Sequence, residues 1–461
     1  MAAMPGGSTA RYLILGTAWS GNGGHTVNRE LAAGLARLGH HVTLRVVGPV
    51  GTLSASVDVQ SLTPIPGIDA RGQLLRADGL PQDVDTVVGA GRFSGGAAGY
   101  LRDQHYPGAR VVHFVHAAVD ELDRWRGDPT QANAHGRTER LLIDRADLAV
   151  GVGPLLAEEA RQLARMGERN PPVHELVAGT TLRPPPHRSP AHTRLNVLLF
   201  GRADDPLKGA DIAAHAVGEL HRRGLDVRLT VRGGNAHNAQ ALADQENRLS
   251  TLAGTTVKVR GFTDDQAELD SDLRGADMVV IPSRQDGFPL TAMEAAGYGI
   301  PILVGSNIGT GMFLTDPSRV PTELGRPSVV PMKGNEPAPD LGHTWADHAE
   351  ELLRDLDRTR TRAMRLRDHL GASYTWEHAA ARLHERVQEI SPTADRTSHT
   401  PSLAEAGPTT TTSPTRGRSR LARITSILVP ETTRPATPRT APGSAPPPPP
   451  PTPDDLPPQL G

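Results

Sequence analysis

Short apolar runs alternate along most of the chain with stretches of helical periodicity, the pattern of strand–helix–strand units in a parallel β-sheet. The clearest helical period covers Thr26–Leu38. In the first half we expect strands at Tyr12–Leu15, Val42–Val47, Thr86–Val88, Val111–Val115, Leu148–Val152 and Val173–Val177. The sequence therefore predicts a first doubly wound domain over residues 1–183.

A second series of strands follows the proline-rich segment Leu182–Pro190. Few contacts are expected to cross such a segment, which is typical of a domain boundary. The expected strands are Asn196–Phe200, Val227–Val231, Val257–Arg260, Met278–Ile281 and Ile302–Val304, with helices such as Ala210–Arg223 and Leu290–Ala296 between them. We predict a second doubly wound domain over residues 191–375.

The last 71 residues, 391–461, differ in composition from the rest, with 17 prolines and 14 threonines. Such a segment buries too little apolar surface to offset the entropy of ordering, so we expect a disordered tail. Its basic stretch Arg416–Val429 has two readings. It is either a solvated linker or a short amphipathic element that makes a weak membrane-surface or protein contact.

Charge and composition narrow the class of protein. The chain has 461 residues, 49 basic and 51 acidic, so a global basic field for nucleic-acid binding is absent. There are no cysteines, which excludes disulfides and thiolate metal sites. No window approaches the ~18 apolar residues of a membrane span, and no basic region precedes Tyr12–Leu15 as in a secretory signal. We therefore expect a cytoplasmic protein.

The first candidate site is the glycine-rich turn Ser20–His25, between the first strand and the Thr26–Leu38 helix. Gly23 and Gly24 allow the backbone to approach a ligand, and the free N–H groups at a helix start attract anions such as a diphosphate. The turn lacks a full dinucleotide fingerprint, so a plain tight turn is the alternative.

The second candidate site is the loop Gly201–Gly209, at the carboxyl end of the first strand of the second domain. Ligands of open α/β sheets gather at such strand ends. Arg202 and Lys208 are suited to a diphosphate through charge-assisted hydrogen bonds. Lys208 is one of only three lysines beside 46 arginines, which favours a specific use of its compact ammonium. The alternative is a solvated loop.

The third candidate site lies in the segment Ala276–Pro301, which predicts a buried strand, a loop with Asp286 and a helix starting near Leu290. Seven residues separate Asp286 from Glu294, so one carboxylate precedes the helix and the other lies about a turn inside it. Both can accept hydrogen bonds from hydroxyls along one elongated polyol ligand. The alternative is an acidic residue that favours the helix dipole, followed by an exposed helical glutamate.

Together these segments resemble the retaining family 4 glycosyltransferases of the GT-B fold. The resemblance covers roughly 11–390 and rests on motifs that this sequence carries: the glycine-rich first turn, Gly201-Arg202 with Lys208-Gly209, Asp286-Gly287-Phe288 followed by Glu294, and Tyr374-Thr375-Trp376-Glu377. It implies an α/β fold of two Rossmann-like domains facing a cleft. It also implies a closing helix, residues 376–390, that returns to the N-terminal domain.

The resemblance assigns roles to the candidate residues. The N-terminal domain would face the acceptor and the C-terminal domain the nucleotide-sugar donor. Arg202 and Lys208 would bind the donor diphosphate, Asp286 a sugar hydroxyl and Glu294 the ribose, while His116 would lie by the transferred sugar. Further donor contacts would come from the Gly23–Gly24 turn, from Phe262 beside the base, and from Gly287, Phe288, Leu290 and Thr291.

One position departs from the family pattern, because Asp286 stands where a glutamate is usual. Its carboxylate reaches about 1.5 Å less far, which puts the identity of the sugar in doubt. The pair Asp83 and Asp85 is expected to form a turn, and we expect no metal site. The basic run Arg360–Arg367 is expected on the solvated side of a late helix.

The sequence thus predicts an enzyme, a metal-independent, hexosyltransferase-like glycosyltransferase that moves a sugar from a nucleotide diphosphate sugar to an acceptor hydroxyl. No cofactor beyond the donor substrate and no nucleic-acid partner are expected, and the acceptor is unknown. Two alternatives stay open. One is a nucleotide-sugar-binding sensor or scaffold without transfer, and the other is a sugar-nucleotide epimerase.

Overall fold

The computed structural model describes residues 9–20, 23–53, 56–118, 127, 129–186 and 194–390. The expected tail at 391–461 lies outside the described residues, as do residues 187–190 of the proline-rich linker. Within the described ranges, no helix combines the length and the apolar character needed to cross a bilayer.

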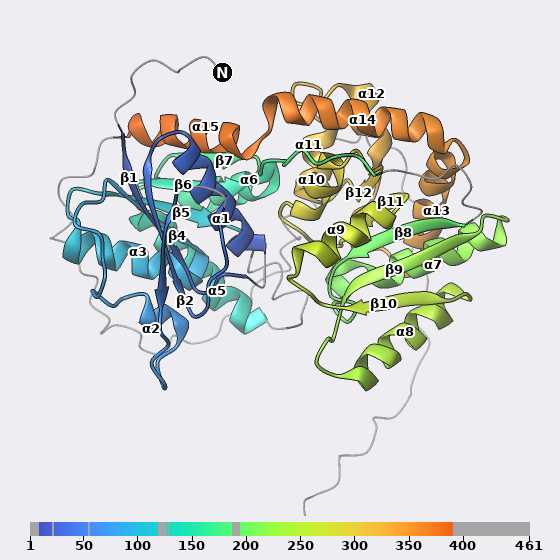
Figure 1. The fold of residues 1–461 in the computed structure, drawn as a ribbon, viewed down its shortest axis with the longest axis horizontal. Helices are drawn as coiled ribbons and strands as arrows, with labels where there is room; N and C mark the ends of the chain where they lie inside the picture. The colour runs from blue at the N-terminus through green and yellow to red at the C-terminus, as the bar shows by residue number, and fades with distance from the viewer. Residues whose placement is uncertain are drawn as a thin grey trace, which may run out of the picture. The chain divides into compact units, whose positions relative to one another are not determined.

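The first half of the chain folds around a parallel sheet of seven strands in the order β3-β2-β1-β4-β5-β6-β7 (Figure 1). The strands are β1 (Arg11–Gly16), β2 (His41–Val47), β3 (Asp58–Leu62), β4 (Thr86–Ala90), β5 (Arg110–Val115), β6 (Leu148–Val152) and β7 (Val173–Leu176). The helices are α1 (Gly23–Arg37), α2 (Ala70–Gln73), α3 (Gly91–His105), α5 (Pro129–Arg145) and α6 (Gly153–Arg165).

The second half folds around a parallel sheet of six strands in the order β10-β9-β8-β11-β12-β13. Its strands are β8 (Leu195–Phe200), β9 (Val227–Gly234), β10 (Val257–Gly261), β11 (Met278–Ile281), β12 (Ile302–Gly305) and β13 (Val329–Val330). Its helices are η1 (Pro206–Lys208), α7 (Ala210–Arg222), α8 (Ala239–Ala253), α9 (Gln266–Gly275), α10 (Leu290–Gly297), α11 (Gly309–Thr315), α12 (Thr322–Gly325), η2 (Arg326–Ser328), α13 (Ala338–Arg354), α14 (Leu356–Ser373) and α15 (Trp376–Gln388).

Both sheets are buried on both faces, because successive residues of each central strand enter different cores. In β1, Ile14 shares a core with α1, whereas Leu13 shares a core with α3. In β8, Leu199 enters the core beneath α7 and α13, whereas Leu198 enters the core that includes α10. This two-sided burial explains why the strands read as unbroken apolar runs, and it confirms the expected doubly wound architecture.

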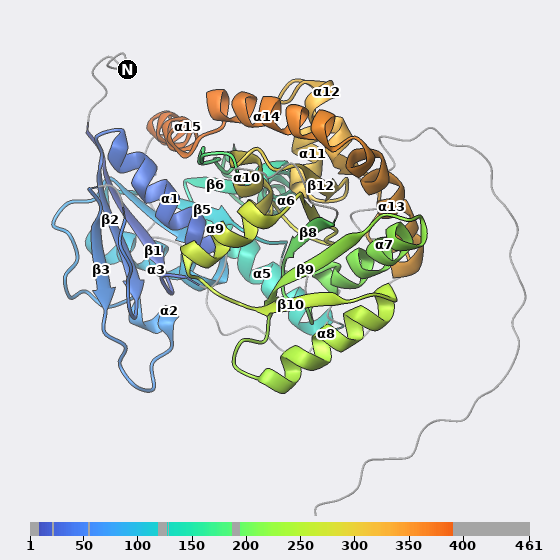
Figure 2. The same ribbon diagram turned by 45° about the vertical axis from the view of Figure 1, so that its right-hand side comes forward.

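The helix expected to close the fold is α15, and it packs against α1 of the first half. Figure 2 shows the two helices side by side, as does the first view. A Cβ on Gly34 of α1 would lie 2.9 Å from the Trp376 carbonyl, so the two backbones are in close contact. The Tyr12 hydroxyl lies 2.7 Å from Nδ1 of His384. The last helix of the described residues is therefore part of the first half's core.

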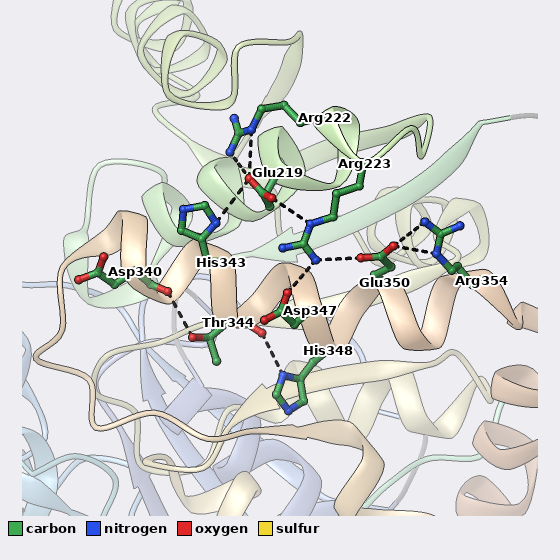
Figure 3. Close-up of polar contacts among 10 residues, drawn as sticks. All are labelled: Glu219, Arg222, Arg223, Asp340, His343, Thr344, Asp347, His348, Glu350 and Arg354. Atoms are coloured by element: carbon green, nitrogen blue, oxygen red, sulfur yellow. Dashed lines mark hydrogen bonds and ion pairs between the residues drawn. The ribbon is translucent and has the colours of Figure 1, made fainter.

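Helices α7 and α13 cover one face of the second sheet and are joined by a charged network at their surface (Figure 3). Arg223, at the end of α7, contacts Glu219 at 2.9 Å, Asp347 at 2.7 Å and Glu350 at 2.8 Å. Glu350 also binds Arg354 at 2.7 Å. Exposed pairs of this kind each contribute little, but the network fixes the end of α7 that lies farthest in sequence from the Lys208 loop.

The expectation for the basic run of α14 is wrong in part, since two of its arginines bind the body of the second half. Arg360 donates to Asp277 at 2.9 Å, and Arg367 donates to the Gly297 carbonyl at 3.0 Å. Asp277 is buried directly before β11, so its charge requires a partner that solvent cannot supply. The long arginine stems lie on α14, and their charged ends reach the protein.

Candidate functional site

A cleft of about 780 Å³ opens between the carboxyl ends of the strands of both sheets. Its wall includes Gly16 at the end of β1, Phe200 at the end of β8 and Ile281 at the end of β11. Every residue that the family resemblance assigned to catalysis or donor binding lines this one cleft: Gly23, Gly24, His116, Arg202, Lys208, Phe262, Asp286, Gly287, Phe288, Leu290, Thr291 and Glu294. The structure thus brings the predicted residues together, while their roles stay predictions.

Residues 21 and 22 of the glycine-rich turn lie outside the described residues, and its second half forms the start of α1, which begins at Gly23. A Cβ on Gly23 would lie 3.8 Å from Leu290, the first residue of α10. Two helix starts therefore meet across the cleft, and both present N–H groups that favour an anion. His25, which the sequence reading did not select, also lines the cleft, and burial lowers the pKa of its imidazole.

The loop that carries Arg202 and Lys208 is shaped by Asp205 and Gly209. Asp205 caps η1 by accepting from the Leu207 N–H at 3.0 Å, and it also pairs with Arg202. Gly209 has φ of +68°, and a Cβ there would lie 2.1 Å from the Pro282 carbonyl oxygen. Only glycine allows this approach, which places the Lys208 loop against the end of β11.

Lys208 and Asp286 form an ion pair in the cleft, with Nζ 2.6 Å from Oδ2. The Asp286 carboxylate raises the pKa of the Lys208 ammonium, which is therefore a stable cation. The sequence placed Asp286 on a sugar hydroxyl and Lys208 on a diphosphate, and it did not predict that the two would bind each other. Residues 78 positions apart in the chain meet here because β8 and β11 are neighbours in the sheet.

Glu294 lies on the cleft side of α10, in its second turn, as the spacing predicted. Its side chain is exposed to the cleft, and desolvation by the surrounding protein raises its pKa to about 7. The Glu30 carboxylate adds to the increase, while Arg183 and Arg29 oppose it. Glu30, Arg29 and Arg183 line the same cleft and were missed, since nothing in their sequence context marks them.

His116 follows β5 and lines the cleft, as expected. Burial, with smaller contributions from His113 and His25, lowers its pKa to about 4, so the imidazole is neutral at pH 7. Its Nε2 atom has no hydrogen-bond partner among the described residues. His113 is buried instead and lies 2.9 Å from Glu139. The two histidines of β5 and its end thus have different environments, and of the two only His116 lines the cleft.

The segment Asp286–Phe288 also holds the two halves against each other. A Cβ on Gly287 would lie 2.3 Å from Leu156 of α6, and Phe288 packs on Gly153 at the start of that helix. Phe288 is 6% exposed, so packing is the main function its surroundings support. Phe262, in contrast, is 52% exposed at the cleft wall.

The described residues contain no group of three His, Asp or Glu side chains suited to holding a metal ion. Asp85 directly precedes β4, and its carboxylate accepts from the Arg11 N–H at 2.7 Å, so this aspartate binds the start of the neighbouring strand β1. Five cationic side chains of the described residues line the cleft: Arg29, Arg183, Arg202, Lys208 and Arg232.

Comparisons with known proteins by family, by sequence and by structure agree. Residues 13–383 match the family described as "Family 4 Glycosyltransferase in conflict systems". The chain is 30% identical over 293 residues to D-inositol 3-phosphate glycosyltransferase of Corynebacterium diphtheriae, a match that covers 59% of this chain and 64% of that protein, less than two thirds of its length. Sucrose-phosphate synthase from Thermosynechococcus elongatus aligns with a TM-score of 0.63 at 19% identity, over 82% of this chain and 98% of that chain.

A further solved structure, Anabaena HepE in complex with UDP-glucose, aligns with a TM-score of 0.60 at 16% identity, over 82% of this chain and 100% of that chain. Because these sequence identities are low, the two structures show only that the fold is shared. They confirm the arrangement of two parallel sheets that the sequence predicted.

Proposed function

We propose a function from the premise that this chain belongs to the family 4 glycosyltransferases. In this proposal it transfers a sugar from a nucleoside diphosphate sugar to an acceptor hydroxyl, with retention at the anomeric carbon. The observation that supports this most is the convergence of Lys208, Asp286 and the start of α10 in one cleft. The cation suits the diphosphate of such a donor, and the carboxylate suits the hydroxyls of its sugar. The free N–H groups suit the negative charge that grows on the diphosphate as it leaves.

In the proposed reaction the bond between the anomeric carbon and the diphosphate oxygen breaks, and its electron pair stays on the diphosphate. The acceptor oxygen forms the new bond on the same face, and its proton passes to the departing diphosphate. Negative charge grows on that diphosphate in the transition state. Lys208, Arg202 and the N–H groups of Leu290 and Thr291 lie in the same cleft and would stabilise this charge.

The remaining residues would bind and orient the donor. Glu294 would accept hydrogen bonds from the ribose hydroxyls, and Phe262 would contact the base. Asp286 would leave Lys208 and turn to a sugar hydroxyl once the diphosphate occupies the lysine. His116, neutral and without a described partner, would exchange a hydrogen bond with the transferred sugar.

Relatives suggest the first substrates to test. One solved structure of this fold holds UDP-glucose, and the Corynebacterium relative is named for an inositol phosphate acceptor. We therefore propose UDP-glucose as the first donor in a panel of UDP-, GDP- and ADP-sugars, and inositol 3-phosphate as the first acceptor.

The test measures the release of nucleoside diphosphate from each donor, with and without acceptor. Lys208→Ala should lower kcat/KM by about 100- to 1000-fold, the usual loss when one donor to a developing anion is removed. Lys258→Ala is the matched control, because Lys258 is exposed and pairs with Glu246 at 3.1 Å. Equal turnover of both variants would remove Lys208 from the mechanism.

The same panel separates the other readings of the sequence. Donor binding without any release of nucleotide would favour a sensor or scaffold, and interconversion of the donor without acceptor would favour an epimerase. Because side-chain cations would neutralise the diphosphate, we expect transfer to persist in the presence of a chelator. Loss of transfer on chelation, with recovery on addition of a divalent ion, would contradict metal independence.

A further inference from the structure

Arg284 connects the two loops that carry Lys208 and Asp286. These loops follow the neighbouring strands β8 and β11, which pair at Met278 and Val197. Arg284 belongs to the loop after β11, two residues before Asp286, and is 8% exposed. A guanidinium buried to this degree requires several acceptors, and those acceptors show what the side chain joins.

The Arg284 side chain binds the loop of β8 at two places. Nη1 and Nη2 donate to the two carboxylate oxygens of Asp211, each at 3.0 Å, in a bidentate pair. Nη1 also donates to the Pro206 carbonyl at 2.9 Å. The main chain adds a third link, because the Arg284 N–H donates to the Leu207 carbonyl at 2.9 Å. Lys208 is the next residue after this attachment.

The other side of the connection is also fixed. The Arg284 carbonyl accepts from Nδ2 of Asn307 at 2.7 Å, which ties the loop of β11 to the turn after β12. Asp286 follows two residues later. Asp211 belongs to the first turn of α7, whose opposite end is held by the network around Arg223 (Figure 3). Arg284 therefore binds a carboxylate on an anchored helix.

We propose that Arg284 is a positioning residue, which sets the place of Lys208 relative to Asp286 and hence to the donor diphosphate. The inference rests on the proposed function for the identity of the ligand. The bidentate pair with Asp211 and the bond to Pro206 fix the direction of the loop, and only a planar guanidinium reaches all three acceptors together. A shift of about 1 Å in such a group can lower turnover by about 100-fold.

The first test compares Arg284→Met with Arg360→Met in the full chain. Arg360 is a matched control, because it also pairs with an aspartate next to β11, namely Asp277, but at the opposite end of the strand from the cleft. Both variants should lose stability, measured as a lower Tm. Only Arg284→Met should lower kcat/KM of the folded enzyme, by about 30- to 100-fold and mainly through kcat. Arg284→Lys, which keeps the charge but not the fork, should recover part of the loss.

The second test asks whether Arg284 acts through Lys208. In the Lys208→Ala background, Arg284→Met should lower kcat/KM by no more than about twofold, because the group it positions is gone. A full additional loss in that background would overturn the proposal. So would equal turnover of the Arg284→Met and Arg360→Met variants.

A binding readout keeps the proposal testable without transfer. In calorimetric titrations, UDP should bind the Arg284→Met variant about tenfold more weakly than the wild type. The Lys208→Ala variant and the double variant Lys208→Ala/Arg284→Met should bind UDP equally well. If the wild type binds UDP but transfers no sugar, the proposed function fails while this comparison still decides the role of Arg284. A wild type that binds neither UDP nor any other nucleoside diphosphate overturns both.

Discussion

Asp286 binds Lys208, the cation that would bind the donor diphosphate. Its Oδ2 lies 2.6 Å from Lys208 Nζ, so the carboxylate and a bound diphosphate would compete for the lysine charge. Asp286→Asn removes this competing charge. We expect the variant to bind UDP about tenfold more tightly, about 1.4 kcal/mol, and yet to turn over donor more slowly, because it loses an acceptor for the sugar hydroxyl.

Calorimetry with UDP and steady-state kinetics with the donor measure the two effects separately. Asp264→Asn is the control for charge alone, since Asp264 lines the same cleft but binds Ser20 at 2.7 Å rather than a lysine. Weaker binding of UDP to Asp286→Asn, or an equal gain in both variants, would contradict the exchange of partners at Lys208.

Glu294 gives the cleft a pH dependence. Its pKa of about 7 lies above the ordinary value of 4.5, so the folded chain holds the proton more tightly than the unfolded chain. As pH rises from about 4.5 to 7, ionisation of this carboxyl therefore lowers stability. Donor binding has the opposite trend, because the ionised carboxylate is the better acceptor for ribose hydroxyls. We expect the donor KM to fall severalfold between pH 6 and pH 8.

The variant Glu294→Gln tests this assignment. The amide still accepts a hydrogen bond but does not titrate, so its donor KM should be higher and nearly constant over the same range. A wild-type KM profile that persists in Glu294→Gln would assign the titration to another group, of which Glu30 is the nearest candidate because burial also raises its pKa.

At the scale of elements, the sequence predicted best those strands that are buried on both faces. Met278–Ile281 is expected and observed with the same bounds, since four consecutive apolar residues have no other place than a core. The strands it missed lie at sheet edges. Asp58–Leu62 is half exposed and polar, and Val329–Val330 is too short to give a pattern.

In the candidate site, too, some features could be predicted from the sequence and others could not. Residues in local motifs, such as Lys208 and Glu294, were found because a loop or helix start displays them. The pairing of Lys208 with Asp286 and the presence of Glu30 were not, since both depend on which strands and helices become neighbours. The sequence thus predicts most of the chemical groups in the cleft but not the contacts between them.

The docking of α15 on the first sheet predicts a second pH effect. His384 of α15 stacks on His40 with ring centroids 4.0 Å apart, and Tyr12 binds His384. Burial and the neighbouring His384 lower the pKa of His40 to about 4. A depressed histidine pKa contributes stability above the unfolded value of about 6.5, and that stability is lost as pH falls toward 4.

We therefore expect the Tm of the wild type to fall between pH 7 and pH 4.5 more steeply than that of His40→Phe, which keeps the ring stacking but does not titrate. After allowance for partial exposure the difference is about 1 to 2 kcal/mol. Arg110, Glu385 and His384 also titrate or carry charge near this contact, and they are unchanged in the variant. Parallel Tm profiles would show that His40 does not carry the effect.

At the scale of the whole described chain, the cleft exists because its two walls touch at defined places. Arg319 of the second half pairs with Glu175 of the first at 3.0 Å, and Ser20 donates to Asp264 at 2.7 Å. Gly153 also packs against Phe288, which lies two residues after Asp286. The geometry of the site is therefore coupled to the packing between the halves.

Gly153 allows the strongest test of this coupling, because it has φ of +80° and a Cβ there would lie 2.3 Å from Phe288 Cδ2. Gly153→Ala adds both backbone strain and a clash with Phe288 in the loop that carries Asp286. Gly39→Ala is the control, since Gly39 has φ of +91° but no atom within 4 Å of the added Cβ. Both should lose about 1 kcal/mol from strain, measured by chemical denaturation.

Only Gly153→Ala should also lower kcat/KM, by about tenfold or more, because the clash displaces Phe288 and with it Asp286. Phe288→Leu in the same chain should return part of the activity by making room for the methyl group. If Gly153→Ala lowers stability as Gly39→Ala does but keeps full turnover, the packing between the halves does not set the geometry of the cleft. The position of Asp286 would then depend on the second half alone, through Arg284 and the Lys208 loop.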